Sequence, residues 1–186
     1  MLPPLCYTEF ILHIDESAGC SMAVSLIPLI IVDRLTDLTP EFLQDKGISF
    51  LMLDFDNTIV PYTTSTPTPL MENWLKEMCA SDIQLCVVSN SKRDRVKIFC
   101  DRYGIPCIIK ARKPFSKGIN ECLAKFGIQP GEAALVGDQI YTDILGANCA
   151  GVTSILVKAI DNHNFWLKAR YVLEKPFIYL ARKRRV

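Results

Sequence analysis

The stretch Ile48-Ser-Phe-Leu-Met-Leu-Asp54-Phe-Asp56-Asn-Thr58 decides how this chain of 186 residues folds. Its first six residues are apolar except for one serine. Such a short, continuous run is typical of a strand that is buried on both faces of a parallel sheet. Two carboxylates and a hydroxyl group follow at alternating positions. We therefore expect the strand to end at Asp54 and to present Asp54 and Asp56 on the same side.

Similar apolar runs recur along the chain, and helical patterns separate them. The expected strands cover residues 48–53, 83–88, 106–109, 133–136 and 153–157. The expected helices cover residues 39–47, 69–80, 93–102, 117–126 and 142–150. This alternation predicts an α/β fold, with a parallel five-stranded sheet and helices on both faces. A hydrophobic content of 49% and a charged content of 22% exclude disordered, collagen-like and coiled-coil chains.

Polar side chains follow several of these strands. Ser89 and Asn90 come directly after the second strand, Lys113 follows the third by a few residues, and Asp138 follows the fourth. The carboxyl ends of parallel strands meet at one edge of a sheet, and ligands bind at this edge. We therefore expect all these side chains to converge with Asp54 on a single site.

These residues resemble the four motifs of the haloacid dehalogenase (HAD) superfamily. Asp54-Phe-Asp56-Asn-Thr58 resembles motif I, Ser89-Asn90 motif II, Lys113-Pro114 motif III, and Gly137-Asp138-Gln-Ile-Tyr-Thr-Asp143 motif IV. The resemblance extends over residues 24–158, in the family's order and spacing. It implies a HAD-like Rossmannoid fold and hydrolysis of phosphate monoesters by way of an aspartyl-phosphate.

The resemblance also implies a role for each residue. Asp54 would be the nucleophile, and Asp56 would first protonate the leaving oxygen and then activate water. A covalent intermediate of this kind splits one difficult hydrolysis into two easier steps. Ser89, Asn90 and Lys113 would bind the phosphoryl group, with the lysine neutralising its charge.

The acidic residues of the motifs point to a cation. Two unit charges 4 Å apart repel by about 4 kcal/mol at an effective dielectric constant near 20, so several carboxylates need a counter-ion in one pocket. All the candidate ligands are hard oxygen atoms, which favours Mg²⁺. The resemblance implies that Asp54, the backbone carbonyl of Asp56 and Asp138 are the ligands. Asp143 and Thr58 would support them, Asp143 by orienting the lysine or a metal-bound water and Thr58, together with Asn57, by shaping the motif I turn.

The connections between the motifs are short. There are 30 residues between Thr58 and Ser89, and 22 residues between Asn90 and Lys113. Each connection has room for one helix together with a loop or a strand, so we expect no cap domain. An open site suits a phosphate that is carried on something bulky, such as a protein, a nucleic acid or a lipid headgroup.

The C-terminal segment, residues 161–186, is basic and amphipathic. Residues 168–186 contain seven Lys/Arg and one Glu, whereas the rest of the chain has a net charge of −5. One helical stripe of apolar residues precedes an expected interruption at Pro176. The stripe comprises Phe165, Trp166, Ala169, Val172 and Leu173. Contact of residues 164–186 with an anionic membrane is the preferred interpretation. A plain core-docked helix and a nucleic-acid-attracting tail stay open as alternatives, although we expect no nucleic-acid partner.

The whole chain resembles the YqeG branch of subfamily IIIA of the HAD phosphatases. Its signs are Leu26-Ile-Pro28, Asp37-Leu-Thr-Pro40, Asp54–Val60 and Gly137–Asp143. That branch resembles the phosphatidylglycerophosphate phosphatases, which implies phosphatidylglycerophosphate as substrate and phosphatidylglycerol as product. Two alternatives stay open. One is a phosphatase for a soluble ester (a nucleotide, a sugar phosphate or a nucleic-acid end). The other is a membrane- or RNA-binding module with a vestigial site.

The N-terminal sequence and the cysteines bear on the compartment. Residues 1–21 contain no Lys or Arg and so lack the positive start of a signal peptide. The apolar run Val24–Val32 is too short to span a bilayer. The eight cysteines include no CxxC pair, and we expect them to be reduced and structural. We expect a cytoplasmic protein, peripheral on the inner face of the cell membrane. Residues 1–21 would be a leader, or precede a true start at Met22, and residues 22–160 would form the phosphatase domain.

Overall fold

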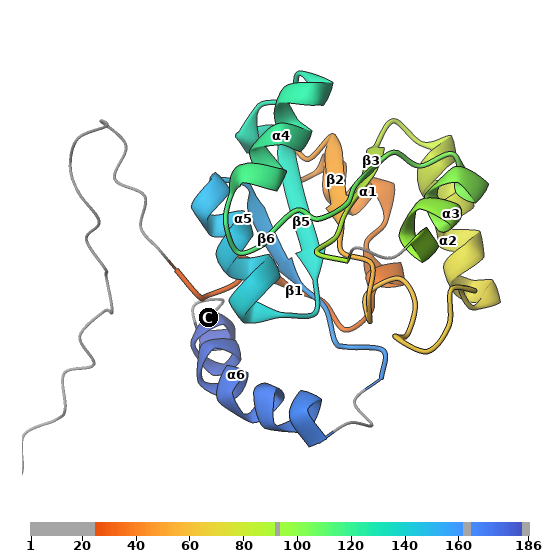
Figure 1. The fold of residues 1–186 in the computed structure, drawn as a ribbon. Coiled ribbons are helices and arrows are strands. Elements are labelled where there is room, and N and C mark those ends of the chain that lie inside the picture. Colours follow the sequence, from red (N-terminus) through yellow and green to blue (C-terminus); the bar gives the residue numbers. More distant parts are fainter. Residues whose placement is uncertain (1–24, 92–93, 162–164, 184–186) are drawn as a thin grey trace, which may run out of the picture.

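The computed structural model describes residues 25–91, 94–161 and 165–183, and residues 165–171 by their backbone alone. The segment expected to be a leader, residues 1–21, and the alternative start at Met22 lie outside the described residues. The described chain forms one parallel sheet between two layers of helices, with a long helix beside one edge (Figure 1).

Among the residues that the structure describes, the sheet has six parallel strands in the order β1-β6-β5-β2-β3-β4. They are β1 (Ile30–Ile31), β2 (Phe50–Leu53), β3 (Gln84–Val88), β4 (Cys107–Ile108), β5 (Ala133–Gly137) and β6 (Thr153–Leu156). The decisive strand β2 is central, and its last residue, Leu53, pairs with Val87 of β3 and Val136 of β5. The ends of these three strands are therefore level, which brings the residues that follow them together.

Six α-helices and three short helical turns accompany the sheet in the described part of the chain. The α-helices are α1 (Pro40–Gln44), α2 (Pro69–Ala80), α3 (Asp94–Tyr103), α4 (Lys117–Phe126), α5 (Leu145–Ala150) and α6 (Phe165–Lys183). The turns are η1 (Leu35–Asp37), η2 (Pro130–Glu132) and η3 (Ile140–Ile144), of which η3 is a π-helix. Helices α2 and α4 have the predicted bounds because their ends carry strong signals. Thr68 caps α2 ahead of a proline in its first turn, and Gly127 ends α4 with a φ of +68°.

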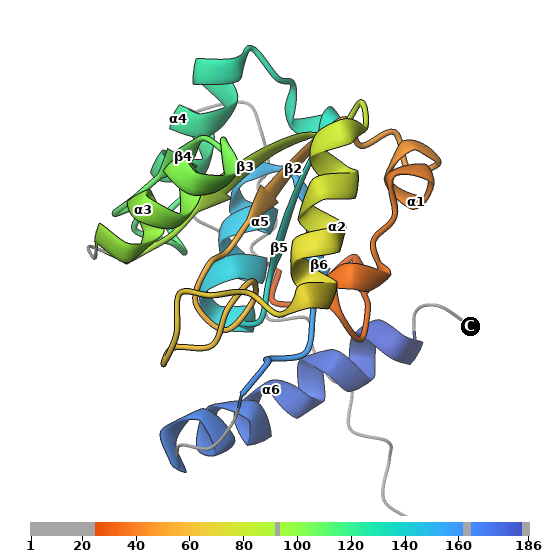
Figure 2. The same ribbon diagram turned by 90° about the vertical axis from the view of Figure 1, so that its right-hand side faces the viewer.

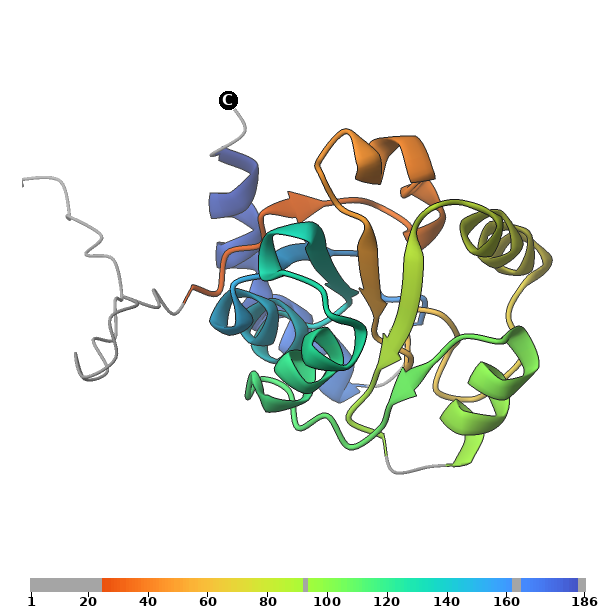
Figure 3. The same cartoon turned by 90° about the horizontal axis from the view of Figure 1, so that it is seen from above.

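The helices cover both faces of the sheet. Leu51 and Leu53 of β2 lie in one apolar cluster with residues of α1, α2 and α3, whereas Phe50 and Met52 lie in a second cluster with residues of α4 and α5. Figure 3 shows these two layers from above. Strand β2 is apolar at every position because both of its faces are buried.

Apart from small shifts at other element ends, four details differ from the sequence-based predictions. Helix α1 ends at Gln44 instead of at residue 47. The sheet has a sixth strand, because Ile30–Ile31 pairs with β6 at the edge. The helix expected at residues 142–150 begins earlier, as the π-helical turn η3. The interruption expected at Pro176 is wrong: α6 continues through this residue. A proline removes one helical hydrogen bond, and here the ring is exposed while the opposite side of α6 packs on the domain.

Helix α6 lies across the edge of the sheet at which the strands end (Figures 1 and 2). Phe177 and Ile178 pack against Ile140, Ile144 and Leu156. Elsewhere at this edge the connections are short, since α2 alone separates β2 from β3, and α3 alone separates β3 from β4. Within residues 25–91 and 94–161, no further domain is inserted into these connections. Among the described helices, none has the length and apolar character needed to cross a bilayer.

Candidate active site

Four loops at the ends of β2, β3, β4 and β5 enclose a pocket of about 190 Å³. Its lining combines acidic, basic, amide and hydroxyl groups: Asp54, Asp56, Tyr62, Ser89, Asn90, Ser91, Lys113, Gln139, Thr142 and Asp143. Six of the eight residues predicted for the site are in this lining. The other two lie beside it: Thr58 is hydrogen-bonded to Asp54, and Asp138 directly follows β5.

A buried ion pair forms the centre of the pocket. Lys113 Nζ lies 2.6 Å from Asp54 Oδ1 and 2.7 Å from Asp143 Oδ1. The side chains of Lys113 and Asp143 are 1% exposed, and that of Asp54 is 8% exposed. Thr58 donates its hydroxyl hydrogen to Asp54 Oδ2 at 3.4 Å. Thr58 and Lys113, which are far apart in the sequence, thus both contact the carboxylate of Asp54, the predicted nucleophile.

Burial and neighbouring charges perturb both partners. Burial raises the pKa of Asp54 from 3.8 to about 7; Lys113 opposes this rise, and the carboxylates of Asp143 and Asp138 add to it. For Lys113, burial alone would lower the pKa, but Asp143 and Asp54 outweigh burial and raise it above its usual value. Lys113 therefore stays protonated, whereas the protonation of Asp54 depends on the charges that bind beside it in the pocket.

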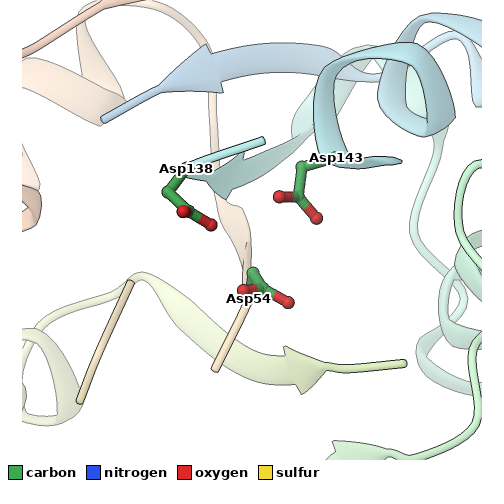
Figure 4. A group of neighbouring side chains, drawn as sticks. All are labelled: Asp54, Asp138 and Asp143. Atoms are coloured by element: carbon green, nitrogen blue, oxygen red, sulfur yellow. The ribbon is translucent and has the colours of Figure 1, made fainter. Parts of the chain in front are cut away.

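The three buried acids fit a divalent cation. Asp54, Asp138 and Asp143 each offer a carboxylate oxygen, and these oxygens lie within 4.8 Å of one another. Figure 4 shows the three carboxylates pointing toward a common space. Three carboxylates and one ammonium group leave two negative charges, which a divalent ion would balance. Hard oxygen donors of this kind suit Mg²⁺. The cluster includes Asp143, which the sequence assigned only a supporting role, as well as Asp54 and Asp138.

Asn57 ties the acidic loop to the turn of motif I. Its φ of +68° lets the chain reverse directly after Asp56. Its side-chain amide donates to Asp138 Oδ2 at 3.3 Å and to the carbonyl of Asp161 at 2.9 Å. The sequence identified Asn57 only as a turn residue, because its partners lie 81 and 104 positions away. The turn therefore also orients one of the candidate metal ligands.

The predicted general acid, Asp56, pairs with a residue that the sequence did not identify. Arg95 Nη2 lies 2.8 Å from Asp56 Oδ1. Arg95 also donates to the carbonyls of Pro61 and Tyr62, and its guanidinium lies 5.1 Å from the ring centre of Phe55. These contacts fix the arginine, so it can hold Asp56 at the mouth of the pocket. Arg95 lies in the first turn of α3 among other charged residues, and no sequence pattern indicates that it faces inward.

Ser89 and Asn90 have different surroundings in the pocket. Ser89 is buried, lines the pocket, and its Oγ accepts a hydrogen bond from Ser91 N. The Asn90 side chain makes two hydrogen bonds to the backbone of Lys113: it donates to the carbonyl at 2.9 Å and accepts from the amide at 2.7 Å. Ser89 is thus available to a ligand, whereas the contacts of Asn90 position the lysine loop.

Gly137 is required by the close approach of Asp143. A Cβ atom at this position would overlap with the Asp143 side chain. We expect Gly137→Ala to displace Asp143 from Lys113, to weaken Mg²⁺ binding about tenfold or more, and to lower the free energy of unfolding by about 1–3 kcal/mol. Calorimetric titration with Mg²⁺ and urea unfolding measure these two effects. Gly131→Ala is the matched control because a Cβ there meets nothing within 4 Å; equal behaviour of the two variants would contradict the prediction.

The affinity for Mg²⁺ should depend on pH through Asp54. At low pH a proton occupies the carboxylate, and the cation has to displace it. We expect the affinity to rise up to about pH 7 and then to level off, with proton release on binding below that pH. The raised pKa also means that the folded chain binds more protons than the unfolded chain between about pH 4 and pH 7. This group therefore makes the metal-free protein less stable as the pH rises through that window. Titrations in buffers of different ionisation enthalpy measure the proton release; an affinity independent of pH would contradict the prediction.

Comparisons with known proteins show similarities in sequence. A family model described as haloacid dehalogenase-like hydrolase matches residues 32–157, which include every predicted site residue. The probable phosphatase YqeG of Bacillus subtilis (strain 168) is 36% identical over 126 residues, which are 68% of this chain and 73% of that protein.

Two solved structures share the fold. An uncharacterized protein from Listeria monocytogenes serotype 4b has a TM-score of 0.51 and 18% identity, over 63% of this chain and 84% of that one. A hypothetical protein from Xanthomonas campestris has a TM-score of 0.51 and 13% identity, over 75% of this chain and 79% of that one. At these identities, the likeness establishes the architecture alone.

Proposed function

We propose that this chain, which belongs to the haloacid dehalogenase-like hydrolase family, is a Mg²⁺-dependent phosphatase. Its preferred substrate in this proposal is the lipid phosphatidylglycerophosphate. The main observation in support of phosphatase activity is the buried arrangement of Asp54, Lys113 and Asp143, with Asp138 beside it. The name of the Bacillus subtilis relative, a probable phosphatase, supports the same reaction.

The chain's own residues supply most of the chemistry. Asp54 attacks the phosphorus atom, the bond to the leaving oxygen breaks, and Asp56 gives that oxygen a proton. Lys113 and Ser89 stabilise the negative charge on the phosphoryl oxygens. Asp56 then takes a proton from water, which attacks the phosphoryl group and restores Asp54. Mg²⁺, when bound by Asp54, Asp138 and Asp143, neutralises charge on the phosphoryl group.

The size of the pocket bears on the kind of substrate. Sites that enclose a small ligand usually have volumes of roughly 300–1,000 Å³, and this pocket has about 190 Å³. It can hold a phosphoryl group while the rest of the substrate lies outside. The short connections leave the mouth open, so the group that carries the phosphate can be as large as a lipid in a membrane.

The outer face of α6 supports a membrane surface as the place of encounter. We define this face by its exposed apolar residues: Val172, Leu173, Tyr179 and Leu180. Lys175, Arg182 and Lys183 are exposed on the same helix. The docked side of α6, which carries Phe177 and Ile178, lies opposite. The side chains of Phe165, Trp166 and Ala169, part of the predicted apolar stripe, lie outside the described residues.

Apolar and basic groups on one helix suit an anionic lipid surface. A basic residue near such a surface contributes about 1 kcal/mol. A lipid substrate carrying extra phosphate is itself anionic, so it concentrates at the same surface. We further propose that the enzyme works on the cytoplasmic side, bound peripherally to the inner face of the cell membrane.

Substrate preference tests the proposal. We expect Mg²⁺-dependent phosphate release from phosphatidylglycerophosphate in mixed micelles to have a kcat/KM at least about a hundredfold above that of glycerol 3-phosphate, because binding outside the pocket is lost with the lipid. A generic aryl phosphate is the second comparison. Equal or better turnover of a soluble ester would contradict the lipid substrate and leave the phosphatase reaction in place.

Charge on the outer face of α6 should affect only the lipid reaction. We expect Leu173→Glu combined with Leu180→Glu to lower turnover of the lipid at a vesicle surface about tenfold or more, because two acidic groups replace apolar ones beside anionic lipid. Turnover of the aryl phosphate should stay unchanged. Leu70→Glu combined with Ile98→Glu is the matched control, since both residues are exposed on other helices. An equal loss in the control pair would remove α6 as the membrane contact.

A further inference from the structure

Helix α6 carries one buried carboxylate, Glu174, on the side that docks on the domain. Glu174 is 2% exposed, and Phe177 and Ile178 of the same helix pack against the apolar cluster of Ile140, Ile144 and Leu156. An acidic side chain is rarely buried in such surroundings unless it has a specific partner, because removing a charge from water is costly. The position therefore calls for an explanation beyond packing.

One partner of Glu174 belongs to the acidic loop of the candidate active site. Glu174 Oε1 accepts a hydrogen bond from the backbone amide of Ile140 at 3.1 Å. Ile140 is the first residue of η3, so its amide has no acceptor within that turn. A negative charge is also favourable at this end of a helix. Glu174 thus fixes the beginning of a turn from a helix that lies 34 positions further along the chain.

The turn held in this way carries two of the three acids of the metal cluster. Asp138 stands two residues before Ile140, and Asp143 three residues after it. The amide of the intervening Gln139 donates to Asp143 Oδ2 at 3.1 Å. Two consecutive amides are therefore held by carboxylates, one from within the turn and one from α6. A shift of the Ile140 amide would move both neighbouring acids.

Two further contacts attach the same turn to α6. Tyr141 donates its hydroxyl hydrogen to the carbonyl of Leu173 at 3.4 Å, and its ring lies 6.2 Å from that of Phe177. Asp138 and Glu174 also line a common cavity of about 300 Å³ between α6 and the ends of β1 and β6. The helix is therefore joined to the acidic loop at several neighbouring positions, and Glu174 makes the buried hydrogen bond among them.

We propose that Glu174 is a positioning residue of the metal site: its hydrogen bond to Ile140 holds Asp138 and Asp143 in the arrangement that binds Mg²⁺. Helix α6 then contributes to the active site by positioning its acidic loop. The inference rests on the proposed Mg²⁺ site and is independent of the identity of the substrate. Groups that orient metal ligands typically change metal affinity or activity by about 10–100-fold when they are removed.

Calorimetric titration of the metal-free protein with Mg²⁺ tests the proposal without any substrate. Glu174→Asp keeps the charge but shortens the side chain by one methylene, so it loses the reach to Ile140. We expect it to bind Mg²⁺ at least about tenfold more weakly than the wild type. Glu174→Gln loses the charge but keeps an acceptor of the same reach, and we expect its affinity to stay within about threefold of the wild type. Glu174→Asp and Glu174→Gln together test the hydrogen bond to Ile140, so the test does not depend on an alanine variant at this position being able to fold.

Ile178→Ala is the control for packing, since it loosens the contact of α6 without touching the hydrogen bond. We expect it to lower the unfolding temperature and to leave the affinity for Mg²⁺ near the wild-type value, whereas Glu174→Asp lowers the affinity at temperatures where it is fully folded. Wild-type affinity in Glu174→Asp, an equal loss in Glu174→Gln, or an equal loss in Ile178→Ala would each overturn the proposal. A wild-type protein that binds no Mg²⁺ would instead contradict the proposed function.

Discussion

Replacing Asp54 by Asn is expected to abolish phosphatase activity while the protein stays folded. We expect kcat to fall by a factor of roughly 10⁴ or more, because a neutral amide cannot attack phosphorus. Lys113 keeps its contact with Asp143, 2.7 Å away, so the fold should retain its buried ion pair. Phosphate release and thermal unfolding measure the two effects in the same preparation.

The matched control for this variant is Asp82→Asn, since Asp82 is exposed and lies away from the pocket. We expect it to keep wild-type activity. If Asp54→Asn retained more than about a hundredth of the activity, with mass spectrometry excluding deamidation back to Asp, another residue would have to be the nucleophile.

Replacing Lys113 by Met is expected to cause the largest loss of stability among the site variants. The change leaves Asp54 and Asp143 buried without their shared cation, and breaking a buried ion pair from one side typically costs about 3–5 kcal/mol. Turnover should be lost as well, because the phosphoryl charge is no longer neutralised. Urea unfolding in metal-free buffer measures the change in the free energy of unfolding.

The same unfolding experiment tests whether the loss of stability in Lys113→Met comes from the unpaired charges of Asp54 and Asp143. We expect acidic pH to reduce the loss, because protonated carboxylates need no cation, and Mg²⁺ to reduce it near neutral pH. Lys110→Met is the control: Lys110 is exposed, so the change in stability should be within about 0.5 kcal/mol. An equal loss in both variants, or a loss in Lys113→Met that neither pH nor Mg²⁺ alters, would contradict the assigned role of Lys113.

The parts of the fold that could be predicted from the sequence are those set by local patterns. Strand β2 is recognisable because it is buried on both faces, and α2 because Thr68-Pro69 marks its beginning. Strand β1 has two residues, too few for any periodicity to be visible. The path of α6 through Pro176 depends on packing against η3 and β6, and no local pattern of residues reports on such tertiary contacts.

The same distinction holds for the candidate site. Asp54, Lys113 and Asp138 follow strands, so topology alone was sufficient to bring them together. Arg95 and Glu174 come from helices, where a charged residue usually faces the solvent. Their partners lie 39 and 34 positions away in the sequence. Only the packing of α3 and α6 turns these two side chains inward.

In the proposed reaction, Asp54 receives the phosphoryl group during turnover. Acid quenching of the enzyme during hydrolysis of a radiolabelled phosphate ester, followed by proteolysis and mass spectrometry, tests it most directly. We expect the label on the peptide that contains Asp54, its removal by hydroxylamine as for an acyl phosphate, and no labelling without Mg²⁺. Label on a different residue, or turnover with no labelled protein in Mg²⁺-containing samples quenched on the timescale of one turnover, would contradict it.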